Sequence, residues 1–175
     1  PAGMKIIKEG GHRLFETDPE TARYVSELLR QLQAGGMDAV RAPSSKFDGW
    51  WPPHYGLTPQ QIADAVAQCP EELIRDTAYC QDNVRRFAQA QLGTMAPLEM
   101  ELRPGVRLGH RHIPVGSVGS YVPGGRYPMF GSAQMSIIPA KVAGVKTVVA
   151  CTPPLKGGGA YPATINAMKA AGADR

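Results

Sequence analysis

The stretch whose residue types best suit ligand binding is Gly119-Ser120-Tyr121-Val122-Pro123-Gly124-Gly125-Arg126. We expect it between the carboxyl end of a strand and a helix, the place where open α/β sheets bind ligands. Its glycines would let the backbone approach a ligand closely and leave N–H groups free for phosphate. Tyr121 could stack on a ring or bond a ribose, and Arg126 could pair with an anion. The stretch is not the G-x-G-x-x-G fingerprint of dinucleotide sites, however, and a structural turn explains it equally well.

Two further places carry side chains capable of chemistry. His110 and His112 alternate on a predicted strand, so both imidazoles would share one face and could chelate a metal. The sequence has no third ligand nearby, so we favour exposed strand residues. Cys151 ends another predicted strand and could be a nucleophile. Because no base stands beside it in the sequence, we favour a small buried side chain.

The remaining candidates are interpreted as structural. Trp50-Trp51 could line a pocket, but packing at the edge of a core is the interpretation we favour. His12 and His54 stand alone and are expected at the surface. The sequence contains no Ser-His-Asp order, carboxylate pair or P-loop. The catalytic groups of an enzyme are therefore not recognisable from local motifs in this chain.

Helices are predicted throughout the first half of the chain. Asp18 suits an N-cap and Pro19 the first helical position, and apolar residues then recur at helical spacing until Gly35-Gly36 ends the helix. Residues 37–41 add one turn, and residues 43–53 predict a loop. Thr58 opens the next helix with a capping box, and Pro70 starts a longer one over residues 71–92. The apolar seam predicted for that longer helix is Leu73, Thr77, Cys80, Val84 and Phe87.

From residue 97 the pattern favours strands. Residues 98–103 alternate apolar and charged side chains, and Pro104-Gly105 turns the chain into a second strand, which predicts a half-buried hairpin. The segments that follow predict an α/β chain with a parallel sheet and right-handed crossovers. They are an extended segment at 115–122, a helix at 132–144, a strand at 147–151 and a helix at 162–171.

Composition and charge narrow the class of protein. The chain has 175 residues, of which 43% are apolar and 19% charged, as in a globular protein. No apolar run reaches the roughly 18 residues of a membrane span, and no secretory signal is visible. An odd number of cysteines without metal-like spacing indicates neither a disulfide scaffold nor a zinc knuckle, and a reducing cytoplasm is the simplest compartment.

The charge is unevenly distributed along the chain. Residues 1–94 hold 10 Lys and Arg against 12 Asp and Glu, whereas residues 95–175 hold 9 against 3. The positive second part could attract an anionic substrate or a dinucleotide, or it could face an acidic surface elsewhere. Its basic residues are dispersed and not interleaved with aromatic ones, which argues against nucleic acid as a partner.

Several segments together resemble one known family. The segments are Arg103–Val106, Pro114–Gly125, Ile138–Lys146 and Thr152–Pro154, with a shorter likeness at Ser45–Asp48. They are similar to the corresponding motifs of histidinol dehydrogenases, and the helical N-terminal region also fits that family. The likeness covers most of the chain and is specific between about residues 103 and 154.

The resemblance implies a fold, cofactors and an activity. It implies a helical N-terminal region at residues 1–95, followed at 96–175 by the start of an incomplete, Rossmann-like, NAD-binding parallel sheet. It implies a zinc-containing, NAD-dependent alcohol dehydrogenase that works as a homodimer with intertwined subunits. Together with the composition and charge pattern, we expect a cytoplasmic protein without nucleic acid or membrane partners. In that family the tyrosine of the Y-[IV]-P-G-G motif lines the NAD site. This tyrosine is Tyr121 here, and Pro123 and Gly124 follow as neighbours of the cofactor.

The family's Glu-His base pair and its zinc ligands lie further along the chain, beyond residue 175. We therefore expect a fragment that is inactive alone. One departure concerns the substrate: Arg126-Tyr127-Pro128-Met129 follows Gly125, where histidinol dehydrogenases tend to have small residues before the proline. This version resembles paralogues such as sulfopropanediol dehydrogenases. Arg126 could face a sulfonate or phosphate, or lie on the surface. The expected substrate is thus L-histidinol or a related small polar alcohol, with a sulfonated alcohol or a non-catalytic anion-binding module as alternatives.

Overall fold

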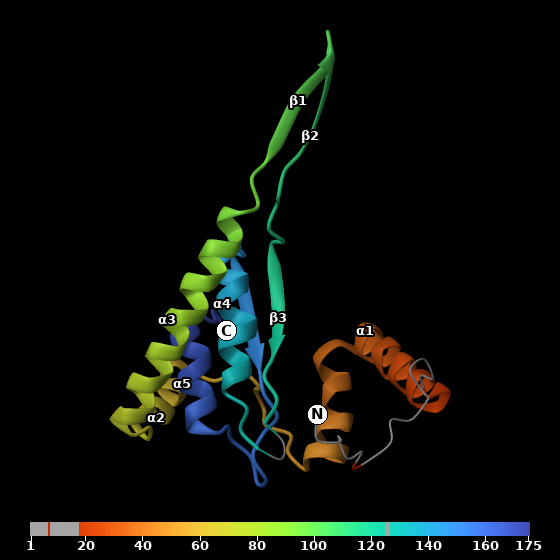
Figure 1. Ribbon diagram of the computed structural model, residues 1–175. Helices are drawn as coiled ribbons and strands as arrows, with labels where there is room; N and C mark the ends of the chain where they lie inside the picture. The colour runs from red at the N-terminus through yellow and green to blue at the C-terminus, as the bar shows by residue number, and fades with distance from the viewer. Residues whose placement is uncertain (1–6, 8–17, 125–126) are drawn as a thin grey trace. The chain divides into compact units, whose positions relative to one another are not determined.

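A computed structural model describes residues 7, 18–124 and 127–175. The chain divides after Lys46 into two compact units. His12, Gly125 and Arg126 lie outside the described residues. The elements in chain order are α1 (Pro19–Asp48), α2 (Pro59–Ala67), α3 (Glu71–Gly93), β1 (Leu98–Arg103), β2 (Val106–His110), β3 (Ser117–Tyr121), α4 (Gly131–Val142), β4 (Thr147–Cys151) and α5 (Pro162–Ala171) (Figure 1).

The first unit is built from the broken helix α1. The helix breaks at Gly36, whose φ of 55° and ψ of −140° are not helical, so the predicted break is confirmed. The predicted loop from residue 43 is wrong, because the helix continues through Pro43 to Asp48. A proline removes one helical hydrogen bond, and the rest of the helix remains intact around Pro43. Ser44 is buried, and the Lys46 ammonium lies 5.3 Å from the centre of the Tyr24 ring.

The second unit begins with the helices α2 and α3. The capping box is confirmed: Gln61 N–H donates to Thr58 Oγ1 at 3.2 Å, and Thr58 N–H donates to Gln61 Oε1 at 2.8 Å. The predicted seam of α3 is wrong in part, because Cys80 is exposed and Phe87 is 67% exposed. The buried face instead comprises Thr77, Gln81 and Ala88. Gln81 is tolerated there because its amide donates to the Ala167 carbonyl at 2.9 Å, a partner on α5 that local pattern could not reveal.

The strands β1 and β2 form the predicted antiparallel hairpin. Leu98 pairs with His110 and Met100 with Leu108, and the register shifts between Glu101 and Arg103. The turn is held by Gly105, which has a φ of 80° and donates its N–H to Glu101 Oε1 at 2.7 Å. The prediction of a half-buried hairpin is wrong, because every residue of both strands is exposed within the described chain. The alternating pattern predicted the pairing but supplied no partner for the apolar face.

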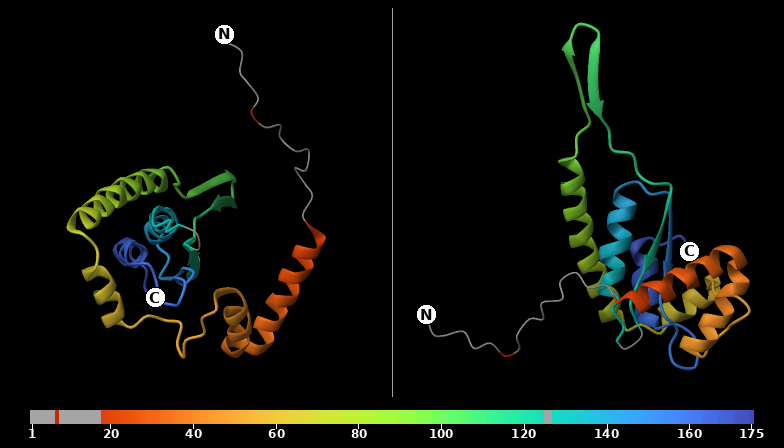
Figure 2. Two further views of the ribbon diagram at one scale, coloured as in Figure 1. Left: turned by 90° about the horizontal axis from the view of Figure 1, so that it is seen from below. Right: turned by 90° about the vertical axis from the view of Figure 1, so that its right-hand side faces the viewer.

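The strands β3 and β4 form the predicted parallel pair, with α4 as the connection between them. Figure 2 shows α3, α4 and α5 together on one side of this sheet. The core lies between sheet and helices, and its fully buried side chains include Val122, Ile137, Ile138 and Val148. The α/β fold with helices first and a parallel sheet after them is therefore confirmed. The predicted limit of a functional domain near residue 95 stays a prediction; the boundary between compact units lies after Lys46.

The residues after α5 run along the free edge of β4. The helix ends at Gly172, whose φ is 102°. Asp174 N–H then donates to the Val148 carbonyl at 2.9 Å, and Ala150 N–H donates to the Arg175 carbonyl at 2.7 Å. The Asp174 carboxylate also accepts from Val148 N–H at 2.7 Å and from Lys141 Nζ at 2.9 Å. These bonds tie β4, α4 and the end of α5 together. Within the described ranges, we find no helix with the length and apolarity needed to span a membrane.

Candidate functional site

The candidate site lies where β3 and β4 end side by side. Tyr121 and Cys151, the last residues of the two strands, are partners in the parallel register. One residue later, Val122 N–H donates to the Cys151 carbonyl at 2.8 Å, so the pairing continues to the point where the chains diverge. Both loops that leave this edge are therefore anchored on the same sheet end, where parallel sheets bind ligands.

The Tyr121 side chain lies open at this edge. It is 62% exposed, whereas the next residue, Val122, is fully buried and anchors the chain in the core. Pro123 and Gly124 are half-buried. Gly124 is confined by the neighbouring loop, because a Cβ atom there would lie 2.9 Å from Thr152 Oγ1. The structure thus places Tyr121, Pro123 and Gly124 together beside the Thr152-Pro153-Pro154 loop, while their contact with a cofactor stays a prediction.

Hydrogen bonds hold the loop between β3 and α4 at both ends. Ser120 Oγ and Ser136 Oγ lie 2.7 Å apart beneath the sheet, and Ser136 Oγ also donates to the Ser132 carbonyl at 2.7 Å. Further along, Met129 N–H donates to the Pro123 carbonyl at 3.1 Å. Since both ends are tied to the sheet and to α4, the Tyr121 backbone is positioned before any ligand arrives.

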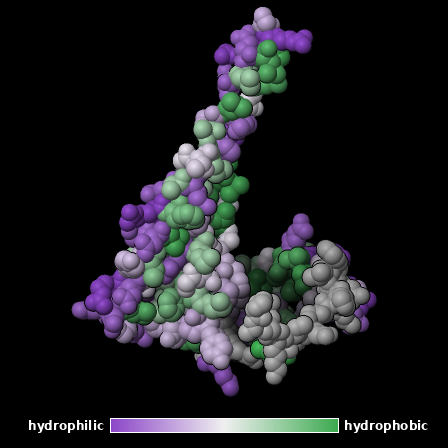
Figure 3. Space-filling model, viewed as in Figure 1, coloured by the Kyte–Doolittle hydropathy of each residue, from purple (hydrophilic) through white to green (hydrophobic). Residues whose placement is uncertain are grey.

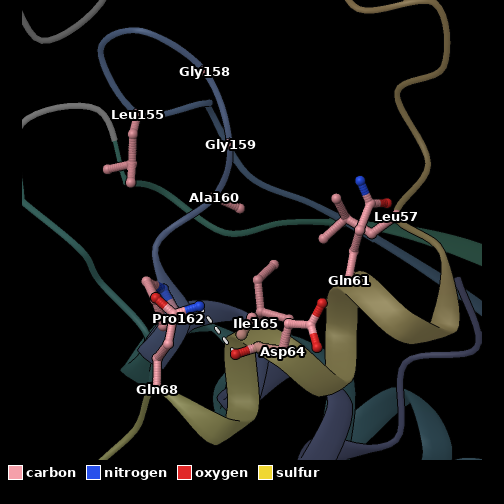
Figure 4. A pocket seen from close by; sticks show the side chains of 11 residues that line it. Leu57, Gln61, Asp64, Gln68, Leu155, Gly158, Gly159, Ala160, Pro162 and Ile165 are labelled. Atoms are coloured by element: carbon pink, nitrogen blue, oxygen red, sulfur yellow. Dashed lines mark hydrogen bonds between the residues drawn. The ribbon is translucent and has the colours of Figure 1, made fainter.

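A hollow with a volume of about 340 Å³ lies between α2 and the loop that precedes α5. Figure 4 shows Gln61 and Asp64 on α2, and Gln68 directly after it, beside this hollow. The opposite wall is apolar or backbone, from Leu155, Gly158, Gly159, Ala160, Pro162 and Ile165. From the sequence, Gln61 was assigned only to the capping box, and Asp64 and Gln68 were given no role. Their spacing on one helix face, at i, i+3 and i+7, was the available signal.

The predicted histidine pair is brought together, but at the surface. The ring centres of His110 and His112 are 5.3 Å apart, and both residues are exposed. Across residues 7, 18–124 and 127–175, no group of three or more His, Cys, Asp or Glu side chains could hold a metal ion. Both histidines are therefore exposed polar residues, as the favoured interpretation predicted.

Other predicted positions have mixed outcomes. The expectation of a buried Cys151 is wrong: the thiol is exposed, because α4 packs against the opposite face of the strand. Trp50 packs edge to face with Tyr55, with ring centres 6.0 Å apart, while Trp51 is 58% exposed. Trp50 also lies against Gly158, where a Cβ atom would approach its indole nitrogen to 2.4 Å. His54 is exposed, as expected.

Two titratable groups in this unit have pKa values shifted by identifiable contacts. The hydrogen bond from Val148 N–H, and then that from Lys141, lower the pKa of Asp174 below its usual value. Burial raises the pKa of the Cys69 thiol, which lies at the end of α2. Neither group belongs to the edge formed by Tyr121 and Cys151, so these pKa shifts belong to the surrounding structure and not to the candidate site.

Comparison with known proteins gives consistent results. The model of the family described as histidinol dehydrogenase matches residues 12–175. A histidinol dehydrogenase homolog of Shouchella clausii is 43% identical over 173 residues, covering 97% of this chain and 40% of the relative. The sulfopropanediol 3-dehydrogenase of Ruegeria pomeroyi is 43% identical over 150 residues, covering 86% and 34%. The histidinol dehydrogenase of Methanosarcina barkeri is 38% identical over 156 residues, covering 89% and 36%.

A solved structure agrees with these sequence relatives. The crystal structure of histidinol dehydrogenase from Elizabethkingia anophelis superposes with a TM-score of 0.83 at 25% sequence identity. The match covers 93% of this chain and 37% of the crystallised one. The chain thus spans about 40% of the length of the relatives it matches. The sequence comparison and the structure comparison give nearly the same share.

Proposed function

The chain belongs to the histidinol dehydrogenase family, a family of dehydrogenases, and from that premise we propose that the whole protein is an NAD-dependent alcohol dehydrogenase. The substrate we propose is L-histidinol or a related small polar alcohol. In this reading, residues 96–175 contribute the first part of the NAD-binding sheet. NAD supplies the hydride acceptor when bound, while this chain's own residues bind and orient it.

The observation that carries the proposal is the open position of Tyr121. The aromatic ring stands at the carboxyl end of a parallel strand, on a backbone anchored by Val122 and by the Ser120–Ser136 contact. An exposed aromatic ring at such an edge suits stacking on a planar ring of a dinucleotide. Pro123 and Gly124 follow immediately and lie half-buried beside the loop after β4.

Zinc has no place among the residues described here. No suitable group of His, Cys, Asp or Glu side chains occurs in the described part of the chain, so these residues do not fit a zinc site. The family resemblance assigns the zinc ligands and the Glu-His base pair to positions beyond residue 175. The described residues therefore supply no zinc-dependent step of the reaction.

A sulfonated alcohol is the second candidate substrate. It is supported by the 43% identity to a sulfopropanediol 3-dehydrogenase, while histidinol dehydrogenases are 37–40% identical. Arg126, outside the described residues, stands in the sequence where a cation could meet a sulfonate. NADH formation by the whole protein, measured at equal concentrations of L-histidinol and sulfopropanediol, would discriminate between the two candidates.

The cofactor assignment is tested by NAD titration of the whole protein and of two variants. We expect Tyr121→Ala to weaken NAD binding about tenfold or more, because a base–aromatic stack contributes roughly 1–3 kcal/mol. Tyr79→Ala is the matched control, since Tyr79 is an exposed tyrosine on α3. Equal NAD affinity in wild type and Tyr121→Ala would contradict the assignment.

The family resemblance also supports a cytoplasmic homodimer, which we propose as the assembly. Light scattering of the whole protein in solution measures its mass directly. A monomeric mass at micromolar concentration would contradict this part of the proposal.

A further inference from the structure

Two side chains on the covered face of the sheet hold the end of β3. Side chains of a strand alternate between its faces, so Ser120 and Val122 face the core while Tyr121 faces outward. Ser120 is 4% exposed and Val122 is fully buried. Apolar packing at Val122 is non-directional, whereas the Ser120 hydroxyl makes a directional hydrogen bond to Ser136 of α4. Ser120 therefore supplies the directional part of this anchor.

The donor and the acceptor of that hydrogen bond can be assigned from the count of hydroxyl protons. Ser136 Oγ donates to the Ser132 carbonyl at 2.7 Å, and a serine hydroxyl has a single proton to donate. In the 2.7 Å contact between the two hydroxyls, Ser120 is therefore the donor and Ser136 the acceptor. Since Ser120 is almost fully buried, water cannot readily replace Ser136 as its partner.

These bonds belong to a closed network around the loop that follows β3. Ser132 N–H donates to the Met129 carbonyl at 2.9 Å, and Met129 N–H donates to the Pro123 carbonyl at 3.1 Å. Pro123 lies three residues after Ser120 along the chain, and Ser136 links Ser120 back to Ser132. Hydrogen bonds in such a network support one another, so the loss of one weakens the others. The candidate cofactor residues lie on the segment that this network encloses.

Pairing within the sheet does not by itself fix the direction of the Tyr121 ring. Among the described residues, β3 pairs only with β4, through ladder bonds that run from strand to strand. Such bonds hold the two strands side by side, but they oppose a rotation of the strand end about its own axis only weakly. The Ser120 hydroxyl bonds across the face of the sheet to α4 and opposes that rotation, which would swing the tyrosine ring.

We propose that Ser136 is a positioning residue for cofactor binding. In this role it does not touch the cofactor, and it acts through Ser120 to hold the Tyr121 ring in the direction in which the ring meets NAD. The inference rests on the proposed function and adds to it a residue of another element, α4. Binding sites need their side chains held within about 0.5 Å and 10–20° by hydrogen bonds behind them, which is what this hydroxyl provides.

NAD titration of the whole protein and of alanine variants tests the contact between the two hydroxyls. We expect Ser136→Ala to raise the Kd for NAD about three- to tenfold, as for the loss of one hydrogen bond. Ser120→Ala breaks the same bond, so the double variant should bind NAD about as well as either single variant. Unchanged affinity in both single variants, or losses that multiply in the double variant, would overturn the proposal.

Two further variants on α4 separate the hydroxyl of Ser136 from a general effect on the helix. Ser136→Thr keeps a hydroxyl at an exposed position, so its Kd for NAD should stay within about twofold of the wild type. Ser132→Ala is the matched control, because the network uses only the backbone of Ser132. Circular dichroism and the thermal midpoint check that each variant is folded. An equal loss of affinity in Ser132→Ala and Ser136→Ala would overturn the specific role of the hydroxyl.

A double-mutant cycle with Tyr121 distinguishes positioning from general stabilisation. If Ser136 acts through Tyr121, Ser136→Ala should change the Kd by less than about twofold once Tyr121 has been replaced by alanine. A purely structural role would instead weaken NAD binding by the same factor with and without the tyrosine ring. That result would overturn the proposal even if Ser136→Ala weakens NAD binding in the wild type.

The outcomes also separate this inference from the function on which it rests. If Tyr121→Ala weakens NAD binding and Ser136→Ala does not, the positioning role is wrong and the proposed function stands. If NAD does not bind, or binds equally well to the wild type and to Tyr121→Ala, the cofactor assignment fails and the positioning role fails with it.

Discussion

The parallel sheet and the hairpin contrast within a single unit of this chain. Both are two-stranded, and both pair in the direction that their sequences predicted. The parallel sheet buries one face beneath α4, whereas the hairpin exposes apolar and charged side chains alike. Green patches of apolar surface along the hairpin are visible in Figure 3. Leu98, Met100 and Leu108 are each about half exposed there.

The difference shows that pairing and burial are specified separately. Alternating side chains and a Pro-Gly turn are local features, and they suffice to pair β1 with β2. Burial requires a second layer, which α4 supplies for β3 and β4 and which no described helix supplies for the hairpin. A hairpin alone is marginal in water, so most of the stability of this unit must come from the sheet and its helices.

The largest loss of stability is expected from a substitution in the core beneath the parallel sheet. Ile137 is fully buried on α4, so Ile137→Ala should lower the free energy of unfolding by about 2–5 kcal/mol. Leu108→Ala removes an apolar side chain of similar size from the hairpin, where it is 55% exposed, and should cost under about 1 kcal/mol. Denaturant unfolding of the whole protein, followed by fluorescence, measures both. Equal losses would contradict the contrast between the two regions.

Local signals in the sequence predicted most of the fold. The capping box of Thr58 and Gln61, the Pro104-Gly105 turn and the β-rich run at 147–151 each depend on neighbours along the chain, and each element formed as expected. Helix α1 shows the limit, since local rules for Pro43 favoured a loop while the helix continues through it. Propensity is a weak guide wherever tertiary contacts outweigh it.

The candidate site was predictable only in its location. The strand end before Pro123 and Gly124 identified the edge of the sheet, and Tyr121 lies there in the open. The sequence did not tell which face of β4 would be covered, so Cys151 was expected to be buried and is exposed. Gln61 and Asp64 became neighbours of the α5 loop through packing between elements that are distant in sequence. Such contacts have no signature in a single sequence.

A glycine in each sheet sharpens the contrast further. A Cβ atom at Gly109 in β2 would lie 2.3 Å from the Leu98 carbonyl oxygen, whereas one at Gly119 in β3 meets open space. We expect Gly109→Ala to destabilise the hairpin ladder by about 1–3 kcal/mol, because backbone must shift. Hydrogen exchange of peptides covering residues 98–110 should speed up, with β3 and β4 unaffected. Gly119→Ala should leave hydrogen exchange in both sheets unchanged. If Gly109→Ala speeds exchange less in the hairpin than in β3, the expectation is contradicted.

The smallest effects are expected when one ion pair in each region is removed and the thermal midpoint is followed as the pH falls. Asp174 accepts from Val148 N–H and from Lys141, and these contacts lower its pKa in the folded state. Its contribution to stability is therefore fully present above the unfolded-state pKa of about 3.9 and is lost as the pH falls through the lower folded-state pKa. Asp174→Asn should reduce the thermal midpoint at pH 7 and match the wild type at pH 2. Glu99→Gln breaks the exposed 3.1 Å pair with Arg107 on the hairpin and should have little effect at either pH, since a pair held only by exposed side chains contributes little. Lys141→Gln should retain the part of the Asp174 effect that comes from the Val148 amide, so a complete loss in this variant would show that the ammonium alone is responsible.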